Sequence, residues 1–132
     1  SIIRLFFNKI NVQNKEINVE LLGEKSSDLI GYRGDTINAM QTILSSIGNK
    51  NTLVRVRVLL DIANYKEKRE ETLKELARKL EKTVKRNGKK IILEPMNSYE
   101  RKIIHTELQN SEYVTTYSIG EEPRRKVVIE KK

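Results

Sequence analysis

The 132-residue chain contains no cysteine, no tryptophan and only one histidine. Without cysteine it can form neither a disulfide nor a thiolate metal site, and one histidine excludes metal centres built from several imidazoles. The sequence also lacks an aspartate-rich loop of the EF-hand type, which leaves only a carboxylate-based cation site open. We therefore expect no metal and no other cofactor.

Long apolar runs are missing as well. The longest are short patches such as Val58-Leu59-Leu60, whereas a membrane-spanning helix needs about 20 apolar residues. The first residues show no pattern of a secretory signal. We therefore expect no membrane insertion, and the absence of cysteine fits a reducing compartment. The hydrophobic content of 37% is sufficient for a globular fold.

Positive charge is in excess: the formal net charge is +8 and the pI is about 9.7. Such a balance favours polyanionic partners, first nucleic acid and second an anionic membrane surface. Residues 1–62 carry 8 basic and 6 acidic side chains, whereas residues 63–132 carry 18 and 12. The densest basic window is 78–90, although a lysine-rich helix face can also be merely solvated. The apolar side of this helix has no tryptophan or phenylalanine anchor, which disfavours the membrane.

Hydrophobic periodicity predicts a mixture of helices and strands without a regular βαβ period, which indicates an α+β fold. Residues 2–10 fit a short amphipathic helix, with a strand as the alternative. In the rest of the first half we expect a strand over 17–21, a one-turn helix capped by Ser26-Ser27-Asp28, a helix from Asp35 to a C-cap at Gly48 with Ile37, Met40, Leu44 and Ile47 on one face, and a strand over Leu53–Ile62.

The second half begins with the longest predicted helix, which we expect to be opened by an Asn64–Glu67 capping pair and ended by Asn87-Gly88. Its apolar stripe and its Glu70/Lys74 pair follow the helical period. Strand 90–93, helix 98–109 and strands 113–118 and 126–130 complete the pattern. The chain therefore predicts two small α+β units that meet near residues 62–65.

The first motif is Gly31-Tyr32-Arg33-Gly34, between a one-turn helix and a longer one. Two glycines allow a sharp turn and a close approach of backbone to a ligand, and helix-terminal amides together with Arg33 favour phosphate. This GxxG loop, with an aliphatic pair before it and an amphipathic helix after it, resembles the KH family. That family clamps the nucleic-acid backbone with these four residues. In a type II KH domain a helix and two strands precede the loop, and here only one strand is evident.

The second motif is Arg101-Lys102-Ile103-Ile104-His105, which places an arginine and a histidine on one helix face. Its surroundings, residues 64–80, 93–97 and 114–118, resemble the R-three-H family, which is associated with single-stranded nucleic acid. A guanidinium and an imidazole could meet a phosphate and stack on a base. We expect Arg101 and His105 to be at least partly exposed, near Tyr99 or the basic turn Arg124-Arg125-Lys126. The alternative is a structural role, in which His105 is buried and caps a backbone carbonyl. The binding residues that the resemblance implies are Arg101, His105, Tyr99, Lys102, Arg124 and Arg125.

A type II-like KH domain (1–63) followed directly by an R-three-H domain (64–132) resembles the C-terminal part of the bacterial Jag proteins, also called KhpB or EloR. The resemblance covers about residues 17–128 and is most specific over 60–73. It implies a non-enzymatic, cytoplasmic single-stranded RNA-binding regulator of cell elongation or division. Its implied partners are RNA and a small single-KH protein, or a second copy of the chain.

Two alternatives stay open. The KH-type unit could act mainly as a protein-interaction adaptor, because its loop has one basic residue. Single-stranded DNA could replace RNA, because neither motif reports on the 2′-hydroxyl. An enzyme is disfavoured, because His105 has no motif-supported nucleophile and neither a Gly-x-Ser-x-Gly nor a Walker loop occurs. We therefore name no catalytic residue.

Overall fold

The fold is that of a computed structural model, which describes residues 4–11, 15–23 and 25–132, with side chains from Lys15 onward. The chain divides into two compact units, Ser1–Lys66 and Glu67–Lys132. Helices and small sheets are mixed in both, so the α+β prediction is confirmed.

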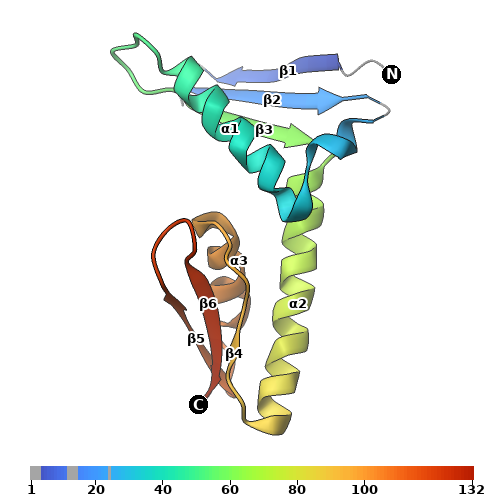
Figure 1. Ribbon diagram of the computed structural model, residues 1–132, viewed down its shortest axis with the longest axis vertical. Coiled ribbons are helices and arrows are strands. Elements are labelled where there is room, and N and C mark those ends of the chain that lie inside the picture. Colours follow the sequence, from blue (N-terminus) through green and yellow to red (C-terminus); the bar gives the residue numbers. More distant parts are fainter. Residues whose placement is uncertain (1–3, 12–14, 24) are drawn as a thin grey trace. The chain divides into compact units, whose positions relative to one another are not determined.

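The first unit contains a three-stranded sheet in the order β1-β2-β3 (Figure 1). β1 (Arg4–Asn11) runs antiparallel to β2 (Glu16–Leu22), which runs parallel to β3 (Arg57–Ile62). The helix predicted over 2–10 is therefore wrong for the described part, and the strand alternative is confirmed there. Pairing with β2 satisfies the backbone of this segment, a non-local gain that local periodicity does not reveal. Two strands thus precede the GxxG loop, as in a type II KH domain.

One face of this sheet forms the core of the first unit. Val19, Leu21, Val58, Leu60 and Ile62 are buried and alternate with more exposed neighbours, which confirms the predicted strand pattern at 58–62. β3 is shorter than predicted. Its pairing with β2 begins where the backbone of residue 57 meets that of residue 16, so the preceding residues, with Leu53 and Val54 exposed, form a loop.

A 3-10 helix, η1 (Ser26–Leu29), leads toward the GxxG loop. Its N-cap residue is Lys25, so the predicted cap at Ser26-Ser27-Asp28 is wrong. Ser26 is instead buried, and its hydroxyl donates to the carbonyl of Gly23 over 2.9 Å.

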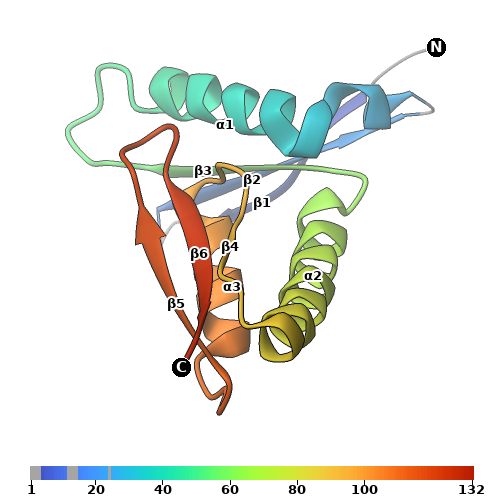
Figure 2. The same cartoon turned by 60° about the horizontal axis from the view of Figure 1, so that its bottom comes forward.

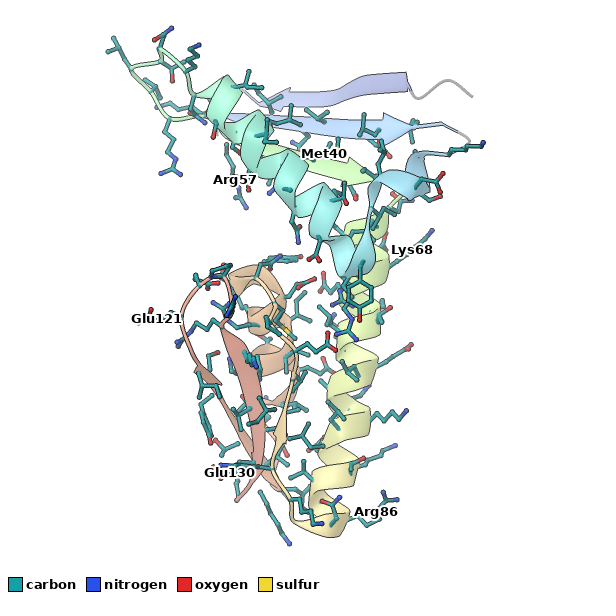
Figure 3. All side chains as sticks on the ribbon, viewed as in Figure 1. Met40, Arg57, Lys68, Arg86, Glu121 and Glu130 are labelled. Carbon is teal, nitrogen blue, oxygen red and sulfur yellow. The ribbon has the colours of Figure 1, made fainter. Side chains whose placement is uncertain are left out.

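Helix α1 (Asp35–Gly48) covers the core face of the sheet (Figure 1). Ile37 is buried, and Met40, on the sheet side of the helix in Figure 3, packs against the same core. Ile47 is 64% exposed, so the predicted apolar face extends too far. Gly48 is not a left-handed cap but the last helical residue, followed by Asn49 as the cap. A Cβ at Gly48 would lie 3.0 Å from Val58, so close packing accounts for this glycine.

The second unit packs two helices on a small antiparallel sheet in the order β4-β6-β5 (Figure 2). Its elements are α2 (Tyr65–Asn87), which begins in the first unit, β4 (Ile91–Ile92), α3 (Ser98–Leu108), β5 (Val114–Ile119) and β6 (Lys126–Lys131). The core is apolar and includes Leu73, Ala77, Val84, Leu93, Ile103, Ile104, Leu108, Val114, Val127 and Ile129. The inward positions predicted for α3 are thus confirmed.

The ends of α2 follow different local rules. At the start, the carboxylate of Asp61 accepts from the backbone amide of Lys66 over 3.2 Å. Asn64 has a left-handed φ of 57° rather than the extended backbone of an N-cap, so the predicted capping pair with Glu67 is wrong. At the other end the prediction is confirmed: Gly88 has a φ of 71° and its amide donates to the carbonyl of Val84.

Helix α3 is held at its N-terminus by polar contacts. The side chain of Asn97 caps it by accepting from the amide of Glu100 over 2.9 Å. The carboxylate of Glu100 is buried and accepts from the guanidinium of Arg69 on α2 over 3.0 Å. This buried pair fixes the position of α3, and therefore of the Arg-x-x-x-His motif that it carries.

Candidate nucleic-acid interface

The GxxG loop turns through three left-handed residues. Gly31, Arg33 and Gly34 have φ values of 73°, 51° and 80°. Gly34 is buried, whereas Tyr32 is 69% exposed and Arg33 is exposed. The guanidinium of Arg33 lies 5.0 Å from the centre of the Tyr32 ring. The turn therefore presents one aromatic and one cationic side chain to solvent.

Both glycines are required by space as well as by backbone angle. A Cβ at Gly31 would lie 2.2 Å from the Thr36 hydroxyl oxygen, and a Cβ at Gly34 would lie 2.5 Å from the Tyr65 hydroxyl oxygen. Real Cβ atoms do not approach neighbours this closely. Thr36 and Tyr65 thus form the underside of the loop, and only glycine fits above them.

The first amides of α1 are used inside the loop. The amides of Thr36 and Ile37 both donate to the carbonyl of Ile30, and those of Gly34 and Asp35 donate to Gly31 and Tyr32. The expectation that these helix-terminal amides would receive a phosphate is therefore not supported at these four positions. The exposed side chains of the loop are better placed for such a contact.

Along the C-terminal half of α1 and the loop that follows this helix lies an open polar hollow. It is lined by Gln41, Thr42, Ser45, Ser46, Asn49, Thr52, Leu53 and Arg55. On its inner side the amide of Leu60 on β3 donates to the side-chain oxygen of Gln41 over 3.0 Å. The side chain of Asn49 holds the loop at Val56 by one bond in each direction, of 2.6 and 2.7 Å. Amides, hydroxyls and a guanidinium with this arrangement can bond to base edges.

The structure places Arg101 differently from our expectation. Arg101 is buried. One guanidinium nitrogen donates to the carbonyl of Met96 over 2.7 Å, and the other donates to the carboxylate of Glu122 over 2.5 Å. The prediction that Arg101 is exposed is therefore wrong. The spacing correctly puts Arg101 and His105 on one side of α3, but Arg101 faces Met96 and the β5–β6 turn, and His105 faces β5.

His105 is partly buried between α3 and β5. Its Nδ1 lies 2.7 Å from the Thr116 hydroxyl and its Nε2 lies 2.9 Å from the Ser118 hydroxyl. Burial, followed by the positive charges of Arg101 and Arg125, lowers the pKa of the imidazole below its usual 6.5. A neutral ring that donates from one nitrogen and accepts at the other fits these two hydroxyls, because each hydroxyl can do either.

The remaining predicted residues fall into two groups. Tyr99 is exposed, and its hydroxyl lies 3.4 Å from the carboxylate of Glu70 on α2, away from the partners of Arg101. Burial and that carboxylate raise the pKa of Tyr99. Lys102 and Arg124 are exposed, and Arg125 donates to the carbonyl of Gly120 over 2.6 Å. Arg125 shares the neighbourhood of His105, whereas Tyr99 does not.

A second hollow adjoins His105 and Arg125. Its lining combines one face of α3 with β5 and two cations, and includes His105, Thr106, Gln109, Thr116, Ser118, Arg125 and Lys132. Sequence reasoning missed Thr116, Ser118 and Lys132. The two hydroxyls occupy alternate positions on a predicted strand, so a search for polar residues on one strand face would have found them. Glu122 and Tyr65 were also missed, and no local pattern signals them.

Neither a metal site nor a membrane span emerges from these residues. Within the described ranges, no three histidine or carboxylate side chains gather as metal ligands would. In the same part of the chain, no helix combines the length and apolar character needed to cross a bilayer.

The comparisons with known proteins agree with this architecture. The model of the KhpA/KhpB KH domain matches residues 7–60, and that of the R-three-H domain matches residues 71–131. A relative from Clostridium symbiosum named "RNA-binding protein KhpB" is 49% identical over 119 residues, or 90% of this chain and 54% of the relative. Relatives of the same name from Bacillus subtilis and Lactiplantibacillus plantarum are 41% and 45% identical, and the matches cover 93% and 80% of this chain.

The chain spans 54%, 60% and 33%, respectively, of the lengths of the Clostridium, Bacillus and Lactiplantibacillus relatives. The two domain matches follow one another along the sequence, in the same order as the GxxG and Arg-x-x-x-His motifs. The chain therefore belongs to the Jag (KhpB) family, as its KH and R-three-H domain region.

Proposed function

We propose that this chain is a non-enzymatic RNA-binding protein that contacts a single strand through its KH and R-three-H domains. The observation that carries the proposal is the GxxG loop, whose glycines stand against the protein while Tyr32 and Arg33 face solvent. A tyrosine can stack on a base and a guanidinium can bond to a phosphate. The polar hollow beside the C-terminal half of α1 offers further hydrogen-bonding partners for base edges.

The second proposed surface is the hollow between α3 and β5. Arg125 and Lys132 supply positive charge, and Thr106, Gln109 and His105 supply hydrogen-bonding groups. Lys102 and Arg124 are exposed cations on the same unit. Single-stranded rather than double-stranded RNA is favoured, because polar hollows and an exposed aromatic ring suit splayed bases.

The relatives named above are called RNA-binding proteins, which supports RNA over single-stranded DNA. From the family resemblance we further propose a cytoplasmic regulator of cell elongation or division. Crosslinking in cells followed by sequencing of the bound nucleic acid tests the proposal. Enriched RNA segments crosslinked at residues of the KH and R-three-H domains support it, and recovery of DNA alone or of no nucleic acid above background contradicts it.

A second candidate is pairing of the KH domain with another KH protein or with a second copy. It is favoured by an uncharged stripe on the solvent side of α1, where Ala39, Ile43 and Ile47 follow one another at helical spacing. Ile43 and Ile47 are 59% and 64% exposed, and apolar side chains grouped on one helix face offer a surface that a partner could cover. Sedimentation of the wild type and of an Ile43→Asp/Ile47→Asp variant, alone and with a single-KH protein, tests this candidate. Identical monomeric behaviour in every mixture contradicts it.

A further inference from the structure

We propose that Glu122 occupies, in the free protein, the place of an RNA phosphate on Arg101, and that binding exchanges the carboxylate for the phosphate. This inference rests on the proposed RNA-binding function and assigns a role to a residue of the β5–β6 turn that the signature motif does not include. Glu122 would thereby set the affinity of the R-three-H surface.

The two bonds of Arg101 differ in how easily they can be exchanged. The guanidinium side chain is 9% exposed, and one of its nitrogens donates to the carbonyl of Met96 over 2.7 Å. Breaking that bond would leave a buried carbonyl without its partner, which is costly. The other nitrogen donates to Glu122, whose side chain is 57% exposed. Glu122 can therefore leave toward water without opening the core.

Chemistry makes the exchange reasonable. A guanidinium binds carboxylate and phosphate oxygens with the same planar set of donors. A buried guanidinium needs an anion or several acceptors near it, because an unpaired buried charge is strongly destabilising. An internal carboxylate meets this need while no RNA is bound, and a phosphate would meet it afterwards.

The neighbouring charges favour an incoming anion once Glu122 has moved. Arg125 is fastened to the carbonyl of Gly120 in the same turn over 2.6 Å. Both Arg101 and Arg125 act on His105 through their positive charge. The two cations thus lie within electrostatic reach of one imidazole, and the carboxylate of Glu122 partly neutralises them.

The competing explanation is that Glu122 only holds Arg101 in place. In that case its removal would loosen the guanidinium and weaken RNA binding. The exchange predicts the opposite sign, because removing the carboxylate removes the competitor of the phosphate while Met96 still orients the side chain.

The experiment compares Glu122→Gln with Glu121→Gln in the full chain. Both substitutions remove one negative charge from the same turn, but of the two carboxylates Glu122 is the one bonded to Arg101 among the described contacts, and Glu121 lies at the outer edge of the turn (Figure 3). Affinity for a short fluorescein-labelled single-stranded RNA is measured by anisotropy. Glu122→Gln should tighten binding about three- to tenfold, and Glu121→Gln by about twofold or less.

A second readout follows the side-chain Nε–H resonance of Arg101 by NMR while unlabelled RNA is added. It should shift with the occupancy of the RNA and reach its limit at lower RNA concentration in Glu122→Gln. Equal effects of the two substitutions, weaker binding by Glu122→Gln, or an Arg101 resonance that RNA does not move would each overturn the exchange. If the wild type does not bind RNA at all, it is the proposed function that fails.

Discussion

Replacing Gly34 with alanine should destabilise the first unit far more than an ordinary glycine substitution. A side chain at a φ of 80° costs about 1–2 kcal/mol, because left-handed backbone brings Cβ close to the following carbonyl. The new Cβ would also lie 2.5 Å from the hydroxyl oxygen and 2.8 Å from Cε1 of Tyr65. The Tyr65 ring packs against the core of this unit and cannot simply rotate away, so displacing it adds about 1–3 kcal/mol.

Together these costs reach about 2–5 kcal/mol, whereas a unit of this size is stable by only about 3–10 kcal/mol. Gly88→Ala is the matched control. Its φ of 71° imposes similar backbone strain, but the nearest atom to the new Cβ, on Lys131, lies 3.9 Å away. We expect Gly88→Ala to cost only the backbone part, about 1–2 kcal/mol.

Urea unfolding followed by circular dichroism gives the free energies, and hydrogen exchange of the α1 amides assigns the loss to the first unit. In a Tyr65→Ala background the additional cost of Gly34→Ala should fall to that of Gly88→Ala, because the steric partner is gone. If Gly34→Ala costs no more than Gly88→Ala in the wild-type background, the close approach of Tyr65 to the loop is refuted.

Three further predictions concern the second unit and its charges. The lowered pKa of His105 means that the folded state binds fewer protons than the unfolded state. The contribution of His105 to stability is therefore complete above about pH 6.5 and is lost as pH falls through the lower pKa of the folded state. Unfolding midpoints should drop between neutral pH and about pH 5.5 in the wild type but less in His105→Gln, and equal drops would contradict this. Arg101→Ala should lower the free energy of unfolding by about 2–4 kcal/mol, since it removes a buried guanidinium and leaves the carbonyl of Met96 unpaired; a loss below about 0.5 kcal/mol would mean that Arg101 is exposed in solution. The logarithm of the RNA affinity should fall with the logarithm of salt concentration at a slope of roughly −3 to −4 if about four to six phosphates are neutralised. The slope should flatten when three exposed lysines are neutralised, two near the end of α2 and one just after it: Lys82, Lys85 and Lys89.

Local sequence signals predicted much of the fold. The alternation at 58–62 and the helix stop at Gly88 depend on residues close together in the chain, and both appear as expected. The segment 4–11 was ambiguous because its aromatic and aliphatic residues fit either period, and only pairing with β2 decides for a strand. The strand predicted from Leu53 was too long because strand pairing also decides its length: its first residues have no partner on β2.

The candidate site was predicted by residue type better than by environment. The GxxG glycines could be recognised from spacing, but the contact of Gly34 with Tyr65 joins residues 31 positions apart and has no local signal. Helical spacing placed Arg101 and His105 on one side of α3 without revealing what that side faces. The partner Glu122 comes from a turn 21 residues later, so burial of Arg101 follows from the tertiary fold and not from the motif.

The central claim is that the exposed side chains of the GxxG loop bind single-stranded RNA. Its most direct test is the affinity of a labelled single-stranded RNA for the wild type and for Tyr32→Asp/Arg33→Asp, with Tyr32→Asn/Arg33→Asn as an uncharged control. Arg33 has a φ of 51°, a conformation that aspartate and asparagine tolerate, so both variants should keep the turn and the melting temperature. We expect the aspartate variant to lose at least about tenfold in affinity, or about 1.4 kcal/mol, and the asparagine control to lose less. Unchanged affinity in a folded aspartate variant would contradict the claim.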